Sequence, residues 1–375
     1  MISSDPRVGE IRLSATVMTH PGRIDEARRL RDQYPELGLQ VVCDPKPDRK
    51  GINLDAAQAS WSSVADWATH HLVIEDDAIL CSRFAERLMA VIAAQPHAAV
   101  ALFAEWGSLS ASVARMAALH GTSFSEVVDH YFPHQAAVLP ADLARGFDAF
   151  AQSATGPKAC DVVMHRYLRS EGVQCYVSVP NLAEHGDLPS LVGARSEFQG
   201  RRKAVCYLSE PPVADEGVLV GARVVPNLVW MKTAAVFDRR DEDGRDHWMP
   251  VPAVELLAEH GMADPALSEA FSFAVSSLTD AGHLRDRVGD RALGELWTAA
   301  FSLGLAALGT GQVPDDPATR PVARQALATL APGGLRRLVP PGELDWLADR
   351  LAPLTLAAVR FAVGEAKAGR AVPIS

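Results

Sequence analysis

The stretch best suited to chemistry is residues 72–80, LVIEDDAIL, where three acidic residues directly follow an apolar run. The acids are Glu75, Asp76 and Asp77. Like charges gathered at the end of a strand repel one another, and a divalent cation relieves that repulsion. Mg²⁺ and Mn²⁺ prefer one or two carboxylates, with phosphates and water as the remaining ligands. The cluster therefore suits a metal–diphosphate complex. The alternative is an ordinary acidic strand end that caps the next helix.

Short β-type runs alternate with helical spacing through the first half of the chain. The predicted strands are 11–19, 39–43, 71–75, 99–103, 135–139 and 174–179. Apolar residues at helical spacing predict helices after the first three strands, and a further helix over 161–168. This alternation predicts an α/β domain with a largely parallel sheet. Ligands of such sheets bind outside the carboxyl ends of the strands, which is where the acidic triplet lies.

The chain between these strands and its second half is less regular. Residues 104–134 are predicted to be mostly helical, and the polar stretch 181–193, with its Pro and Gly, is predicted to be a loop. Arg and Lys cluster at 195–203, which favours a domain boundary there. We therefore expect a catalytic-type domain over 1–200 and a mainly α-helical accessory domain over 201–375.

The accessory domain has the pattern of packed helices. A β-like piece over 218–229 and a charged turn over 238–246 come first. Apolar residues at helical spacing then predict helices over 251–260, 265–308, 318–331 and 342–368. Three roles stay open for this domain: acceptor binding, homo-oligomerisation, or support of the catalytic domain.

Composition narrows the classes of protein. The chain has 375 residues, 48% of them hydrophobic, and a net charge of −10. This acidic balance argues against non-specific nucleic-acid binding, although backbone amides and a metal could still hold an anionic nucleotide. The five cysteines are widely spaced, form no CxxC motif and are odd in number, which disfavours a disulfide framework or a thiolate zinc site.

The ends and apolar runs of the chain predict a cytoplasmic protein. The N-terminus lacks the charged and apolar regions of a signal peptide. The longest late apolar run, 296–308, is interrupted by Thr, Ser and Gly and is shorter than the roughly 20 residues of a membrane span. We therefore expect no membrane span.

Taken together, the Glu-Asp-Asp strand end and an upstream strand followed by Thr-His-Pro-Gly-Arg resemble the GT-A-fold glycosyltransferases over residues 11–195. The triplet matches that fold's DXD motif in its EDD form. The resemblance implies a Rossmann-like nucleotide-diphospho-sugar transferase domain. It also implies transfer from a nucleotide sugar, UDP-sugar first, to a soluble acceptor such as a peptide, protein, glycan or natural product. The implied cofactor is Mn²⁺ or Mg²⁺, with Asp77 as its principal ligand.

The resemblance assigns a nucleotide pocket to three loops. The turn after the first strand, with Thr19, His20, Pro21 and Arg23, would hold the base and ribose, and a capped helix start is the alternative reading of this turn. The remaining donor-binding candidates follow the second and third strands; they are Asp44, Lys50, Asn53, Glu75 and Asp76. For Asp44 the alternative is a turn before Pro45, and for Lys50 and Asn53 it is a plain loop that ends in a helix N-cap.

A histidine segment closes the resembling region. His185 lies in Pro-Asn-Leu-Ala-Glu-His-Gly-Asp, with Ser190 and Gly193 following, and the family places a metal or diphosphate contact at this histidine. Asp187 departs from the small or apolar residue that is usual there, which leaves the phosphate contacts open. The alternative is a solvated loop histidine.

An inverting transfer also needs a general base. In the resembling enzymes this base is a carboxylate just before a helix, and Asp161 has that position. A helix N-cap is the alternative, and a retaining enzyme would need no such base. Glu105 and Trp106, after the fourth strand, could flank the acceptor, since Trp stacks on sugar faces, with core packing as the alternative for Trp106.

Two other functions compete with glycosyl transfer. A sugar-phosphate nucleotidyltransferase would carry a Gly-rich, basic loop after the first strand, whereas this loop has a single Gly. A non-catalytic GT-A-like binding or scaffold module would be favoured by a broken acidic triplet, and the triplet is intact.

Overall fold

The computed structural model forms two compact units. The first unit comprises 1–103, 129–198 and 209–216, and the second comprises 104–128, 199–208 and 217–375. The second unit thus differs from the predicted accessory domain, 201–375, in also taking in 104–128 and 199–200 and in lacking 209–216. The structure describes residues 10–49, 53–156, 159–186, 188, 201–241, 247–262 and 264–374.

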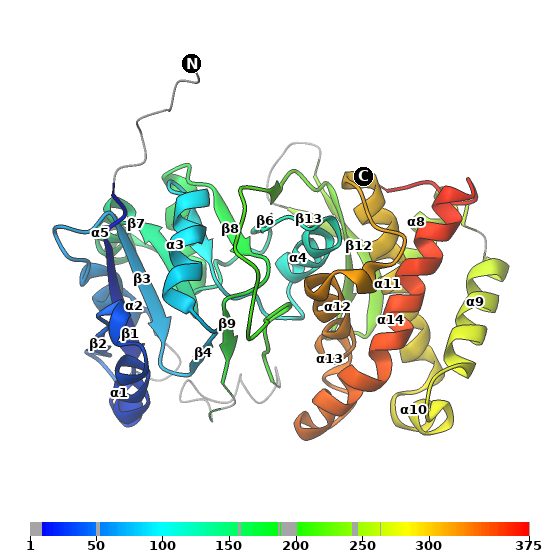
Figure 1. Ribbon diagram of the computed structural model, residues 1–375, viewed down its shortest axis with the longest axis horizontal. Helices are drawn as coiled ribbons and strands as arrows, with labels where there is room; N and C mark the ends of the chain where they lie inside the picture. Colours follow the sequence, from blue (N-terminus) through cyan, green and yellow to red (C-terminus); the bar gives the residue numbers. More distant parts are fainter. Residues whose placement is uncertain are drawn as a thin grey trace, which may run out of the picture. The chain divides into compact units, whose positions relative to one another are not determined.

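A six-stranded part of the central sheet lies in the first unit (Figure 1), in the order β8-β5-β7-β3-β1-β2. Strand β7 runs antiparallel to its neighbours β3 and β5, whereas the pairs β1–β2, β1–β3 and β5–β8 are parallel. The predicted α/β unit with a largely parallel sheet is therefore confirmed. The bounds are β1 Leu13–Thr19, β2 Gln40–Cys43, β3 His70–Glu75, β5 Ala99–Ala101, β7 Ala136–Pro140 and β8 Cys175–Ser178.

Burial explains why β3 is a central strand. Its residues Leu72, Val73 and Ile74 are each at most 1% exposed, so apolar side chains point to both faces of the sheet. Each such burial stabilises the fold by roughly 1.5–3 kcal/mol, and it requires helices on both faces. Figure 1 shows α3 in front of the strands and α2 behind them. The helices of this unit are α1 Ile24–Gln33, α2 Leu54–Ser62, α3 Phe84–Ala94, α5 Ala141–Ser153 and α6 Cys160–Ser170, with 3₁₀ turns η1 Pro21–Arg23 and η2 Pro35–Leu37.

Strand register brings three loops to one edge of the sheet. Met18 of β1 lies opposite Glu75 of β3, and Thr19 lies opposite Cys43 of β2. The backbone N–H of Asp44 continues the β1–β2 ladder by donating to the Thr19 carbonyl over 2.8 Å. The chain after β1, β2 and β3 therefore leaves the sheet at the same place.

A small antiparallel pair adds a second wall to this edge. Strand β4, Ala78–Leu80, pairs with β9, Ala183–His185, and Ala78 lies opposite His185. The prediction of a loop throughout 181–193 is wrong for these three residues. Their pairing with β4 could not be read locally, because the partner strand precedes them by most of the domain.

The second unit combines a small sheet with packed helices. Strands β11 Val224–Val229, β12 Ala234–Arg240 and β13 Trp248–Pro252 form an antiparallel sheet, and β6 Phe124–Glu126 pairs in parallel with β10 Val218–Leu219. Two predictions are corrected here: 104–134 holds one helix and a strand, and the predicted charged turn over 238–246 begins inside β12. The helices are α4 Leu109–His120, α8 Ala253–Glu259, α9 Asp264–Ser276, α10 Ala281–Val288, α11 Asp290–Thr310, α12 Pro321–Ala328, α13 Leu330–Leu335 and α14 Leu344–Lys367, with 3₁₀ turns η3 Pro317–Thr319 and η4 Pro341–Glu343.

Helix α11 contains the apolar run that was predicted to be too short for a membrane span. The helix has 21 residues and is long and apolar enough to cross a membrane by length and composition alone. However, 72% of its most apolar window is buried inside the protein. It packs against α14 within a core that includes Leu296, Trp297 and Phe301, as is typical of a core helix.

Candidate functional site

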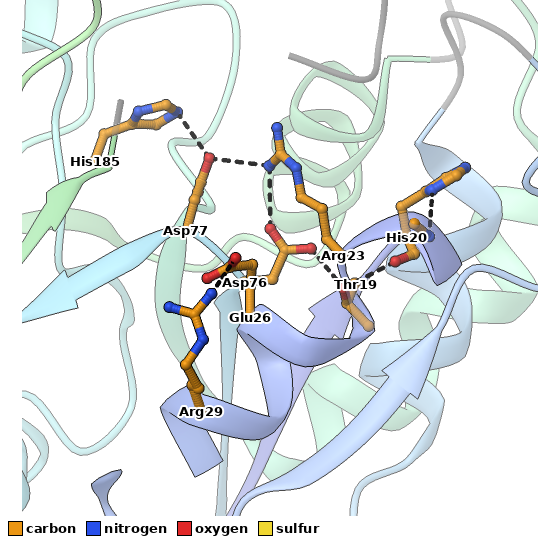
Figure 2. Close-up of polar contacts among 9 residues, drawn as sticks. Thr19, His20, Arg23, Glu26, Arg29, Asp76, Asp77 and His185 are labelled. Atoms are coloured by element: carbon orange, nitrogen blue, oxygen red, sulfur yellow. Dashed lines mark hydrogen bonds and ion pairs between the residues drawn. The ribbon is translucent and has the colours of Figure 1, made fainter. Parts of the chain in front are cut away.

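Asp76 is held at the sheet edge by two neighbours (Figure 2). The Thr19 hydroxyl donates to its Oδ2 over 2.5 Å, and Nη1 of Arg23 lies 3.2 Å from its Oδ1. Only 7% of the Asp76 side chain is exposed. Burial raises the pKa of this carboxyl, and the Thr19 hydrogen bond and the Arg23 charge oppose that rise. Thr19, Arg23 and Asp76, predicted as neighbours of one ligand, therefore do meet.

Asp77 presents its two carboxylate oxygens differently. Oδ2 lies 3.3 Å from Nη1 of Arg23 and 3.6 Å from Nε2 of His185. Oδ1 is buried and has no hydrogen-bond partner among the residues that the structure describes. Figure 2 shows the His185 ring directed at this carboxylate from β9. A buried carboxylate oxygen without a partner carries a desolvation cost that a bound cation would offset.

Gly186 allows β9 to approach this close, and sequence analysis gave it no role. Its N–H donates to the Asp77 carbonyl over 2.7 Å, and a Cβ at this position would come within 2.5 Å of the same oxygen. A larger residue would therefore push β9, and His185 with it, away from Asp77. The signal available in the sequence was only a glycine next to a candidate ligand.

The turn after β1 is capped by one of its own side chains. His20 caps η1, because its Nδ1 accepts from the Gly22 N–H over 3.0 Å, so the capped helix start is present. Its Nε2 then carries the proton and faces the Pro47 carbonyl at 3.4 Å. Pro21 occupies the first position of η1 and is exposed. His20 and Pro21 thus shape the turn, and Arg23 at its end reaches the acids.

The loop after β2 carries three of the predicted donor-binding residues, Asp44, Lys50 and Asn53. Oδ1 of Asp44 accepts from the Lys46 N–H over 2.8 Å, which is the turn contact expected before a proline. Lys50 lies outside the described residues. Asn53 takes the N-cap position of α2, but its side chain does not cap that helix. Instead, its Oδ1 accepts from the Cys160 N–H at 3.4 Å.

A second polar chain starts at Glu75. Its Oε1 lies 3.3 Å from Nδ1 of His134, whose Nε2 contacts the Cys160 thiol. Burial raises the pKa of that thiol well above its usual range, so the S–H donates to Nε2 and the Nδ1–H faces Glu75. No role at the site was predicted for Cys160. Together with the Asn53 contact, this chain ties the start of α6 to the acidic strand end.

Asp161 is the second residue of α6, which begins at Cys160. The prediction that Asp161 lies just before the helix is therefore wrong. The N-cap is Ala159, and Oδ1 of Asp161 accepts from the Val162 N–H over 2.8 Å. The side chain is partly exposed. A carboxylate in the first turn of a helix interacts favourably with the helix dipole.

Trp106 is buried in the core, and Glu105 has an ion-pair partner. Trp106 is 4% exposed and belongs to the core of the second unit, so its ring offers no free face for a sugar. Glu105 is ion-paired with Nη1 of Arg336, and burial raises the pKa of its carboxyl. Arg336 also stacks on Trp230, 4.0 Å from the ring centroid. The core alternative holds for Trp106, and the sugar-stacking prediction is wrong.

A hollow of about 600 Å³ lies beside α2 and α5, and none of the acids of Figure 2 lines it. Its basic side chains, Lys46 and Arg49, both pair with Asp55 at 2.7 Å. The Lys46 hydrogen bond, with Arg49 beside it, lowers the pKa of the Asp55 carboxyl. Asp55 and Asp148, which also line the hollow, balance these two cations, so we take the acidic edge, not this hollow, as the candidate site.

The donor set at the acidic edge fits a hard divalent cation that shares its ligands with phosphate and water. Within the described residues, no three His, Cys, Asp or Glu side chains form a metal-binding group. Asp77 and His185 would supply one oxygen and one nitrogen, which Mg²⁺ or Mn²⁺ accepts when phosphates complete the shell. Asp187, Ser190 and Gly193 lie outside the described residues. Neither the protein-family models nor the curated proteins compared with the chain match it.

Proposed function

We propose that the first unit is a metal-dependent glycosyltransferase domain of the GT-A type. It would move a sugar from a nucleotide-diphosphate sugar, UDP-sugar first, to a soluble acceptor such as a peptide, protein, glycan or natural product. The carrying observation is Asp77, which faces His185 while its buried Oδ1 has no hydrogen-bond partner among the described residues. The cytoplasm is the proposed location, and the second unit would bind the acceptor or mediate homo-oligomerisation.

Different residues would bind the diphosphate and the nucleoside of the donor. Asp77 and His185 would hold Mn²⁺ or Mg²⁺, which supplies positive charge to the diphosphate leaving group. Thr19 and Asp44, adjacent where β1 and β2 end, would receive the nucleoside. Asp76 would orient Thr19 and Arg23 through the contacts that it already makes with both.

On the acceptor side, Asp161 would act as the base of an inverting transfer. It would take the proton from the acceptor hydroxyl while that oxygen bonds to the anomeric carbon and the nucleoside diphosphate leaves. The polar chain through Cys160 and His134 supports this role, because it fixes the start of α6 relative to Glu75. A retaining enzyme would leave Asp161 without this task.

One observation favours a second candidate, a nucleotide-binding module without turnover. Arg23 already pairs with both Asp76 and Asp77, so the acids have a cation from the chain itself. A module of this kind would bind UDP without a metal. A sugar-phosphate nucleotidyltransferase has no comparable support at this site.

Donor hydrolysis separates the two candidates. The full chain would be incubated with a panel of UDP-sugars and Mn²⁺ or Mg²⁺, and released UDP would be measured for wild type and Asp77→Asn. We expect slow, metal-dependent release from one sugar in wild type and none in the variant. UDP binding without release from any nucleotide sugar, in the presence of either metal, would support the module instead.

A further inference from the structure

Arg23 occupies an unusual position for a donor-binding residue. A single atom, Nη1, lies 3.2 Å from Oδ1 of Asp76 and 3.3 Å from Oδ2 of Asp77. The side chains are largely buried, with 15% of Arg23 and 6% of Asp77 exposed. Such a guanidinium is not a loose surface charge: it is the cation that lets two adjacent carboxylates share one buried edge.

The partners of Asp77 are gathered on one oxygen. Arg23 and His185 both face Oδ2, whereas Oδ1 is buried and without a partner in the described part of the chain. A divalent cation on Asp77 would lie next to the Arg23 guanidinium, and like charges at that range repel. A metal on Asp77 would therefore weaken the contact between Arg23 and Asp77.

We infer that Arg23 is an exchangeable cation of this site: it neutralises Asp76 and Asp77 when no metal is bound, and it turns to the donor diphosphate when a divalent cation takes Asp77. This inference rests on the proposed function. Arginine suits both states, because its planar fork pairs with carboxylate and with phosphate alike. Arg23 is the last residue of the 3₁₀ turn η1 and directly precedes α1, so its backbone is fixed while its long side chain can reorient.

The inference makes Arg23 act in opposite directions on two ligands. Without nucleotide it competes with the metal, so Arg23→Gln should bind Mn²⁺ more tightly than wild type. With Mn²⁺ present it assists the diphosphate, so the same variant should bind UDP more weakly. A charge-assisted hydrogen bond is worth enough to make each change about tenfold.

The test measures free Mn²⁺ by electron paramagnetic resonance, without nucleotide, and UDP affinity by calorimetry at saturating Mn²⁺. Arg29→Gln is the matched control: it removes the same charge from α1, but Arg29 pairs with Glu26 and is 70% exposed. We expect wild-type affinities in the control, both shifts in Arg23→Gln, and small shifts in Arg23→Lys. Should Arg23→Gln be unstable, Mn²⁺ should raise its melting temperature more than that of wild type.

The outcomes separate this inference from the proposed function. If wild type binds neither Mn²⁺ nor UDP, both are overturned. If wild type binds both through Asp77 while Arg23→Gln binds Mn²⁺ no more tightly than Arg29→Gln does, only the exchange is overturned. Weakening of both ligands in Arg23→Gln would also overturn it, because that result describes a purely structural arginine.

Discussion

The N–H of Gly186 donates to the carbonyl oxygen of Asp77 over 2.7 Å, and this contact brings the strand that carries His185 onto the acidic turn. A Cβ on Gly186 would lie 2.5 Å from that oxygen. The two candidate metal ligands, Asp77 and His185, are thus neighbours because Gly186 has no side chain to keep the two backbone segments apart. The first prediction follows from this contact.

Gly186→Ala should move β9 away from Asp77. We expect a loss of about 1–3 kcal/mol of unfolding free energy, the usual cost of overpacking, and weaker Mn²⁺-dependent UDP binding. Urea unfolding and calorimetry measure the two effects. Gly364→Ala is the control, since nothing lies within 4 Å of its added Cβ and it belongs to α14. Wild-type stability together with wild-type binding in Gly186→Ala would show that the approach is not tight.

Asp161→Asn should lower kcat by about 10²–10⁴-fold, the range for loss of a positioned base, and leave UDP affinity unchanged. The asparagine oxygen can still accept from the Val162 N–H, so the first turn of α6 keeps its contact. Asp161→Ala removes both the base and the contact to the Val162 N–H, so any further loss relative to Asp161→Asn measures the structural role of this contact. Near-normal kcat in Asp161→Asn would take this residue out of the mechanism and point to a retaining enzyme.

Asp44→Ala should raise the donor KM more than it lowers kcat, because the residue would contact the nucleoside and not the reacting atoms. Asp44→Asn preserves the turn contact to the Lys46 N–H and so separates charge from loop shape. Steady-state kinetics over donor concentration gives both constants. A fall in kcat at unchanged KM would place Asp44 in the chemistry instead.

His71 should make the fold acid-sensitive. It is fully buried in β3, where Nδ1 accepts from the Ser14 hydroxyl over 2.7 Å and Nε2–H donates to the Ser60 carbonyl over 3.0 Å. Burial lowers its pKa from 6.5 to about 4. The unfolded chain therefore binds a proton that the folded chain does not between those values, so stability falls as pH falls, by about 1.4 kcal/mol per pH unit.

The measurement is the unfolding free energy at pH 7, 6 and 5. His71→Gln should be less stable at pH 7, where it loses neutral hydrogen bonds, but its stability should fall less steeply toward pH 5. The exposed His97 provides the control variant His97→Gln, which should keep the wild-type slope. An unchanged slope in His71→Gln would show that this histidine is protonated in the folded state as well.

Local pattern was enough to predict the sheet edge but not its second wall. Strand β3 and the acids after it were predictable, because an apolar run followed by charge marks where a buried strand leaves a sheet. Strands β4 and β9 have three residues each, which is too short for an alternation of apolar and polar residues to be recognised in the sequence. Only their pairing with each other makes them strands. The meeting of Asp77 and His185 was therefore expected only through a family resemblance.

Trp106 and Asn53 show the same limit in side chains. Trp106 follows a predicted strand as a ligand-binding residue would, yet its neighbours in the core come from segments far along the chain. Asn53 occupies an N-cap position, but its oxygen accepts from Cys160 of α6. Position in an element was predictable for both residues, and the choice of partner was set by tertiary packing.

The proposed function depends on a cation that Asp77 would hold between the chain and a nucleotide diphosphate. Calorimetry of UDP with and without Mn²⁺ on wild type, Asp77→Asn and Asp25→Asn tests it most directly. Asp25 lies on α1 with 83% of its side chain exposed, so its variant matches the charge change outside the site. We expect Mn²⁺ to strengthen UDP binding in wild type and Asp25→Asn, and to have no effect in a folded Asp77→Asn. Equal UDP affinity with and without Mn²⁺ in wild type, or a retained Mn²⁺ effect in Asp77→Asn, would contradict the account.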